Sequence, residues 1–83
     1  MGGDDFNVLA QRIDGVAWVL TSLIHQLDMD GRLDSAALCN SLRNTADVRG
    51  RYPGLDHSAA LIRELADGVD AARTARQSRA RPA

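Results

Sequence analysis

The stretch from Asp5 to Leu27 constrains the fold most, because it holds the longest periodic run of apolar residues in the chain. Its large apolar side chains are separated alternately by three and four residues, the heptad spacing that places them on one side of a helix. These residues, which we call the heptad stripe, are Phe6, Leu9, Ile13, Val16, Leu20, Leu23 and Leu27. Ala10, Ala17 and Ile24 widen the stripe, so the pattern predicts a bundle helix with partners on more than one side.

Two shorter apolar patterns predict two further helices. The first helix is expected to end near residue 27. Leu38, Leu42 and Ala46 predict a second helix over residues 35–48, which should lean on the first. The third helix is predicted over residues 57–75, with its apolar side formed by Leu61, Ile62, Leu65, Val69 and Ala72.

The segments between these helices carry turn signals. Gly31 can adopt the left-handed conformation that closes a turn, and Asp34 is a natural cap for the second helix. The first connection is therefore expected to reverse the chain. Pro53 and Gly54 form a strong turn pair, and Asp56 is the expected cap of the third helix.

The chain of 83 residues has room for a single domain, residues 1–83, with flexible ends at 1–3 and about 76–83. A core of this size contributes no more than about 3–5 kcal/mol, so we expect two chains to associate. The predicted fold is all-α: a three-helix unit, a helical hairpin plus a short helix, that forms a dimeric helical bundle. In it the first and third helices are long, and antiparallel packing buries the heptad stripe.

The cysteine content and hydropathy indicate a cytoplasmic protein. The chain has one cysteine, Cys39, which excludes an intramolecular disulfide and implies no oxidising compartment. Its apolar runs are too short to span a bilayer, and its beginning lacks the pattern of a signal peptide. We therefore expect no membrane association.

The acidic turn between the first two helices is partly similar to a calcium-binding EF-hand loop. Asp28, Asp30 and Gly31 match the centre of such a loop. With Gly31 aligned to the loop glycine, however, Gln26 and Ala37 occupy the positions of the first carboxylate and the bidentate glutamate. The pattern is therefore interpreted as a turn with helix caps, and no metal is expected.

No residue pattern in the chain indicates catalysis. His25, Cys39 and His57 lie on three different predicted helices and have none of the short spacings of zinc sites. Cys39 lies among apolar residues, which is typical of a small buried thiol rather than a nucleophile. We expect neither enzyme activity nor a cofactor.

The charges are distributed unevenly along the chain. Residues 4–34 hold six aspartates and two arginines, whereas residues 73–83 hold four arginines and no acidic residue. The arginine-rich end permits an alternative function as a nucleic-acid-associated accessory factor. We favour a solvated tail, because the net charge is −1 and no aromatic residue accompanies the arginines for stacking on bases.

Trp18 is the most informative single residue, because it lies opposite the heptad stripe among small residues. Either it packs under the second or third helix of its own chain, or it belongs to an intermolecular surface. We favour the second interpretation, because tryptophan is enriched in binding hot spots. The predicted partner-binding residues, for a second copy or another protein, are Gln11, Gly15, Trp18, Val19, Ser22 and His25.

Residues 12–47, RIDGVAWVLTSLIHQLDMDGRLDSAALCNSLRNTAD, resemble small helical regulators carried by temperate bacteriophages. The likeness consists of a leucine-rich helix, an acidic turn and a second short helix. Such proteins bind a host protein directly, and known types block a quorum-sensing transcription activator, a pilus assembly ATPase or a CRISPR complex. The resemblance implies an inhibitor or adaptor of a host regulatory protein, and it assigns no functional residues.

Overall fold

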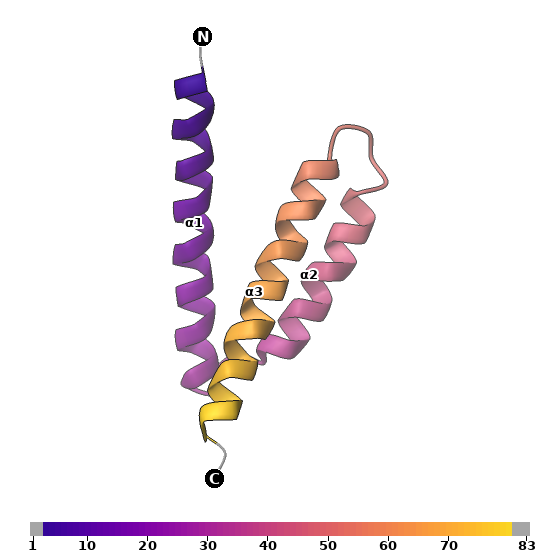
Figure 1. Ribbon diagram of the computed structural model, residues 1–83. Helices are drawn as coiled ribbons and strands as arrows, with labels where there is room; N and C mark the ends of the chain where they lie inside the picture. Colours follow the sequence, from indigo (N-terminus) through magenta and orange to yellow (C-terminus); the bar gives the residue numbers. More distant parts are fainter. Residues whose placement is uncertain (1–2, 81–83) are drawn as a thin grey trace.

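A computed structural model describes residues 3–80 as three α-helices, with no strand in that range. They are α1 (Gly3–Met29), α2 (Ser35–Arg49) and α3 (Asp56–Ala80) (Figure 1). The prediction of an all-α fold with long first and third helices is therefore confirmed. The third helix continues five residues beyond the predicted end at 75, so residues 76–80, expected to be a flexible tail, are helical. Residues 81–83 lie outside the described part of the chain.

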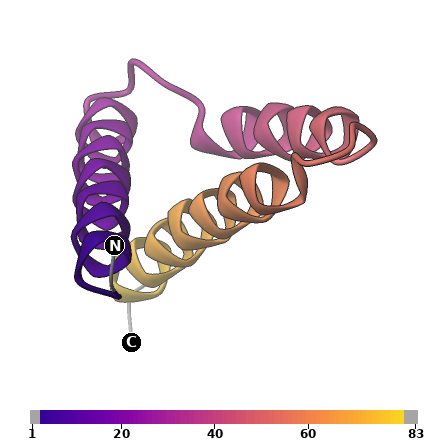
Figure 2. The ribbon, with the colours of Figure 1, turned by 90° about the horizontal axis from the view of Figure 1, so that it is seen from above.

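α2 and α3 form a helical hairpin, and α1 diverges from it (Figures 1 and 2). α2 runs antiparallel to both other helices and packs chiefly on α3, so the prediction that it leans on the first helix is wrong. α1 and α3 run in the same direction. They meet near their carboxyl ends and separate toward their amino ends, which leaves the first half of α1 standing away from the hairpin.

The connections follow the predicted turn chemistry. Gly31 and Gly54 both have positive φ angles, 72° and 84°, which glycine adopts without steric cost. The Asp34 carboxylate accepts a hydrogen bond of 3.1 Å from the backbone N–H of Ala37 and thereby caps α2, as predicted. Asp56 lies in the first turn of α3 rather than before it, where its negative charge still favours the helix dipole.

The core between α2 and α3 is built from small side chains. Its buried residues include Cys39, Ala66 and Val69, and Ile24 of α1 and Leu42 of α2 pack against them. The largest fully buried side chains of the described residues are only those of Cys39 and Ser35. Small residues at this contact let the two helices approach closely, but they remove little apolar surface from water.

The heptad stripe is not buried within one chain, contrary to the expected antiparallel packing with the third helix. Phe6 is 78% exposed and Val16 is 60% exposed, and Leu9, Ile13, Leu20 and Leu23 are exposed as well. The half-buried positions of α1 instead include Ala17, Thr21, Ile24 and Asp28, a line of residues beside the stripe. α3 therefore meets α1 on the edge that the small residues form, and the larger side chains remain in solvent.

Candidate protein-binding surfaces on α1

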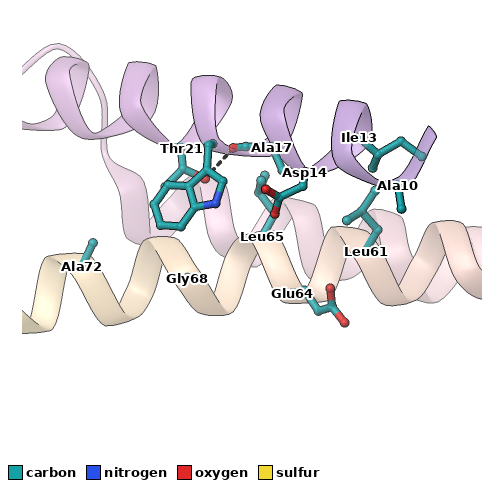
Figure 3. Close-up of a pocket in the computed structure, with 11 residues that line it drawn as sticks. Ala10, Ile13, Asp14, Ala17, Thr21, Leu61, Glu64, Leu65, Gly68 and Ala72 are labelled. Carbon is teal, nitrogen blue, oxygen red and sulfur yellow. Dashed lines mark hydrogen bonds between the residues drawn. The ribbon is translucent and has the colours of Figure 1, made fainter. Parts of the chain in front are cut away.

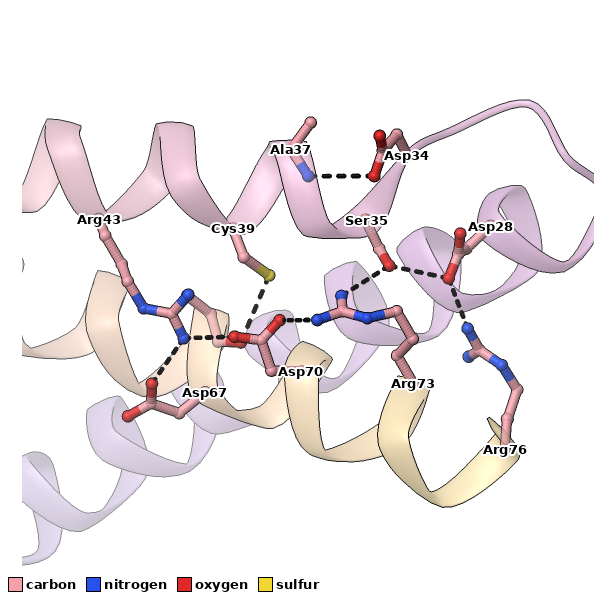
Figure 4. A network of polar contacts seen from close by, with 11 residues as sticks. Asp28, Asp34, Ser35, Ala37, Cys39, Arg43, Asp67, Asp70, Arg73 and Arg76 are labelled. Carbon is pink, nitrogen blue, oxygen red and sulfur yellow. Dashed lines mark hydrogen bonds and ion pairs between the residues drawn. The ribbon is translucent and has the colours of Figure 1, made fainter. Parts of the chain in front are cut away.

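A polar junction holds the carboxyl end of α1 against the hairpin (Figure 4). Arg76 of α3 donates to the Asp28 carboxylate and to Nδ1 of His25. The Ser35 hydroxyl, at the start of α2, donates to Asp28 over 2.8 Å and accepts from Arg73 over 2.9 Å. The junction therefore joins all three helices at one point, and the Ser35 hydrogen bond keeps the pKa of Asp28 below its usual value.

The same network continues along the contact between α2 and α3. Arg43 donates to both Asp67 and Asp70, and Asp70 also accepts from Arg73. The two arginines, Arg43 foremost, lower the pKa of Asp70. Cys39 is buried beside them, with Sγ 3.4 Å from the carbonyl oxygen of Ala66, and its burial raises the pKa of the thiol. A buried thiol with a raised pKa is a poor nucleophile, which is typical of structural cysteines.

Because the junction lies at one end of α1, two grooves open between α1 and α3 farther along. The first groove lies on the side of the heptad stripe and has a volume of about 340 Å³. Almost every residue that lines it is apolar, with one arginine at its edge. The lining residues are Arg12, Ile13, Val16, Ala17, Leu20, Leu61, Ile62 and Leu65. We call this surface the stripe groove.

The second groove, which we call the tryptophan groove, has a volume of about 490 Å³ (Figure 3). Trp18 is 65% exposed and lines it from α1. Trp18 is two residues beyond Val16, about 200° round the helix, so the two grooves lie on opposite sides of the line where α1 faces α3. The remaining lining residues are Ala10, Ile13, Asp14, Ala17, Thr21, Leu61, Glu64, Leu65, Gly68 and Ala72.

The predicted partner-binding residues do not form a single surface. Trp18 lies in the tryptophan groove, whereas Gly15 and Val19 lie on the outer side of α1, next to Val16 and Leu20. His25 is half-buried in the polar junction. The other two predicted residues, Gln11 and Ser22, are exposed and line neither groove.

Sequence reasoning missed the contribution of α3 to both grooves. Leu61 and Leu65 line each of them, and Glu64 and Gly68 line the tryptophan groove. The missing side chain of Gly68 is not needed for close packing, because a Cβ atom built there meets no other atom within 4 Å. A glycine within a helix weakens that helix, and no close packing at Gly68 compensates for the loss. This glycine was the signal in the sequence for an open surface at this position.

The arginine-rich end contributes to the junction rather than forming a free basic patch. Arg73 and Arg76 are both half-buried and hydrogen-bonded to acidic residues. Arg79 lies in the last turn of α3, and Arg81 is outside the described residues. Two of the four arginines are therefore engaged within the protein.

Within residues 3–80, no group of three or more His, Cys, Asp or Glu side chains is placed to hold a metal ion. No helix in that range combines the length and the apolar character needed to cross a membrane. The distinctive surfaces are the two grooves.

Comparisons with known proteins add no assignment. The chain matches no family model, no curated protein and no solved structure.

Proposed function

We propose that this protein is a non-enzymatic, cytoplasmic protein-interaction module that works as a homodimer and binds a regulatory protein through α1. The resemblance to phage regulators makes an inhibitor or adaptor of a host protein the preferred form of this function. Two surfaces have separate roles: the stripe groove binds a second copy of the chain, and the tryptophan groove binds the regulatory protein.

The observation that carries the proposal is the distribution of apolar side chains. Among the residues whose burial the structure describes, the buried ones are alanine, cysteine, serine and valine, whereas phenylalanine, tryptophan and most leucines of α1 are exposed. A folded chain normally buries its large apolar residues in preference to its small ones, because each large side chain contributes about 1.5–3 kcal/mol when it is removed from water. Contiguous exposed apolar surface of this kind marks a protein–protein interface.

The exposed apolar area beside the stripe groove is similar to the apolar area that each chain buries in a standard dimer interface. On the side of the stripe groove, eight large apolar residues expose 40–78% of their surfaces: Phe6, Leu9, Ile13, Val16, Val19, Leu20, Leu23 and Leu61. At about 100–200 Å² for each side chain, this is on the order of 600 Å² of apolar surface. A standard interface buries about 800 Å² per partner, of which somewhat more than half is apolar.

A second copy suits this side better than a foreign protein does. The core between α2 and α3 is too small to stabilise the chain by a wide margin, and α1 contributes little to it. A dimer would complete the core at the time of folding, before any partner is met. The same surface supplies both exposed apolar side chains outside the groove, such as Phe6 and Leu23, and the apolar groove itself, as a self-complementary two-fold contact requires.

Capture of binding proteins from a host lysate, followed by mass spectrometry, tests the proposal when three chains are compared. The wild type and Val8→Ala should retain the same protein, and Trp18→Ala should lose it. Val8 is the matched control because it is 50% exposed on α1 but lines neither groove. A protein retained equally by all three would show that this groove is not the binding surface. Removal of residues 77–83 leaves Arg76 and the polar junction in place, and loss of capture by that shortened chain would favour the nucleic-acid alternative.

A further inference from the structure

The two charged residues that line the tryptophan groove are both acidic. Asp14 and Glu64 are its charged lining residues, and no arginine lines it. Neither carboxylate forms an ion pair with a basic side chain of the described residues. Most other acidic groups near α3 are neutralised by arginines, as Asp47, Asp67 and Asp70 are. The groove is therefore a site of uncompensated negative charge.

The aromatic side chain lies where it can act with this charge. Asp14 and Trp18 are four residues apart on α1 and so share one side of the helix. In Figure 3, the Asp14 side chain extends from α1 toward Leu65. The Glu64 side chain extends from the side of α3 that is turned away from α1. A cation between Asp14 and Trp18 would contact the carboxylate of the first and the exposed indole of the second, and both groups attract positive charge.

The remaining lining residues indicate the kind of molecule that carries the cation. The α1 side of the groove extends from Ala10 to Thr21, about 16 Å or three helical turns at 1.5 Å per residue. The long sides are apolar, with Ile13, Leu61 and Leu65 among them. This length and lining suit one side of an amphipathic helix rather than a small organic cation.

We propose that the tryptophan groove binds an amphipathic helix of the partner protein that inserts an arginine or lysine side chain between Trp18 and Asp14, with Glu64 at the rim. This inference rests on the proposed function and specifies the chemistry of the partner. Gly68 is the feature that makes room for the helix, because the space above its Cα atom is empty. The stripe groove differs in this respect, because its charged lining residue is Arg12, which would repel the same side chain.

A set of synthetic helical peptides tests the inference. All share a leucine-lined face, and one central position is arginine, lysine, citrulline, leucine or glutamate. Citrulline is the matched control, because it keeps the shape of arginine without the charge. Binding is followed by the fluorescence of Trp18, which is the one tryptophan of the chain. The arginine and lysine peptides should bind at least tenfold more tightly than the citrulline peptide, and added salt should reduce that ratio.

Variants of the protein assign the effect to the groove. The double variant Asp14→Asn, Glu64→Gln should remove the preference for charge and leave binding of the leucine peptide unchanged. Asp5→Asn is the control, since it removes a carboxylate of α1 that does not line the groove. Gly68→Leu should fill the groove and block every peptide while circular dichroism and solution mass stay those of the wild type.

The possible outcomes separate this inference from the proposed function. Equal binding of arginine and citrulline peptides, blocked by Gly68→Leu, would overturn the cation preference and leave protein binding in place. If no peptide binds, or if Gly68→Leu has no effect on those that do, the groove is not the docking surface. A monomeric wild type would instead contradict the proposed dimer without affecting these ratios.

Discussion

Replacing Trp18 by alanine separates a binding role of the indole from a core role. The residue is 65% exposed, so about one third of a surface of roughly 250 Å² is buried within the chain. At about 25 cal/mol per Å², that third contributes about 2 kcal/mol to folding. The exposed remainder, about 160 Å², would contribute about 4 kcal/mol when a partner covers it.

The expected result is therefore unequal losses in the two measurements. Urea denaturation followed by circular dichroism should show a loss of at most about 2 kcal/mol. Calorimetric titration with the captured partner should show a loss of about 2–4 kcal/mol, the range of a hot spot. Val8→Ala serves as the control and should change neither value by more than about 1 kcal/mol. A stability loss of about 3–5 kcal/mol with unchanged partner binding would show that the indole is a core residue.

Three further predictions concern the helices that position this surface. Gly68→Ala should raise the free energy of unfolding by about 1 kcal/mol in thermal melts, because alanine favours the helix and meets no atom there; an unchanged or lower melting temperature would contradict this. Arg76→Gln should cost about 1–3 kcal/mol and speed amide hydrogen exchange in the last turns of α1, because the Asp28 carboxylate loses a charged partner at the junction; unchanged exchange there would show that the junction does not hold α1. The pKa values of Asp28 and Asp70 are lowered in the folded chain, so both carboxylates stabilise the fold above their unfolded pKa of about 4. This contribution is lost as the pH falls through the folded pKa values. The urea midpoint should therefore drop between pH 5 and pH 3, and it should drop less in Asp28→Asn.

The existence of the three helices and the turns between them could be predicted because their signals are local. The heptad spacing, the cap at Asp34 and the positive φ angles at Gly31 and Gly54 each depend on a few neighbouring residues. The end of α3 could not be predicted in this way. Its last turns follow a fading apolar pattern, and Arg76 is engaged by Asp28, a residue 48 positions earlier in the chain.

The side of α1 that meets α3 was also beyond sequence reasoning. An apolar stripe indicates which side chains are to be covered, but not whether the same chain or another molecule covers them. In the structure, small residues such as Ala17 and Thr21 are half-buried, whereas the larger Val16 and Leu20 remain exposed. Trp18 is exposed, and so is the stripe opposite it; the position of Trp18 in one groove with Asp14 and Glu64 depends on α3.

Sedimentation equilibrium of the wild type and of Val16→Asp, at tens of micromolar chain, tests the proposed use of the stripe groove most directly. The wild type should sediment as a dimer, at twice the chain mass of 8.9 kDa, and its melting temperature should rise with concentration. A charge at Val16 should yield a monomer, because the carboxylate would be buried at the contact. A wild type that sediments at 8.9 kDa and melts independently of concentration would contradict self-association through the heptad stripe.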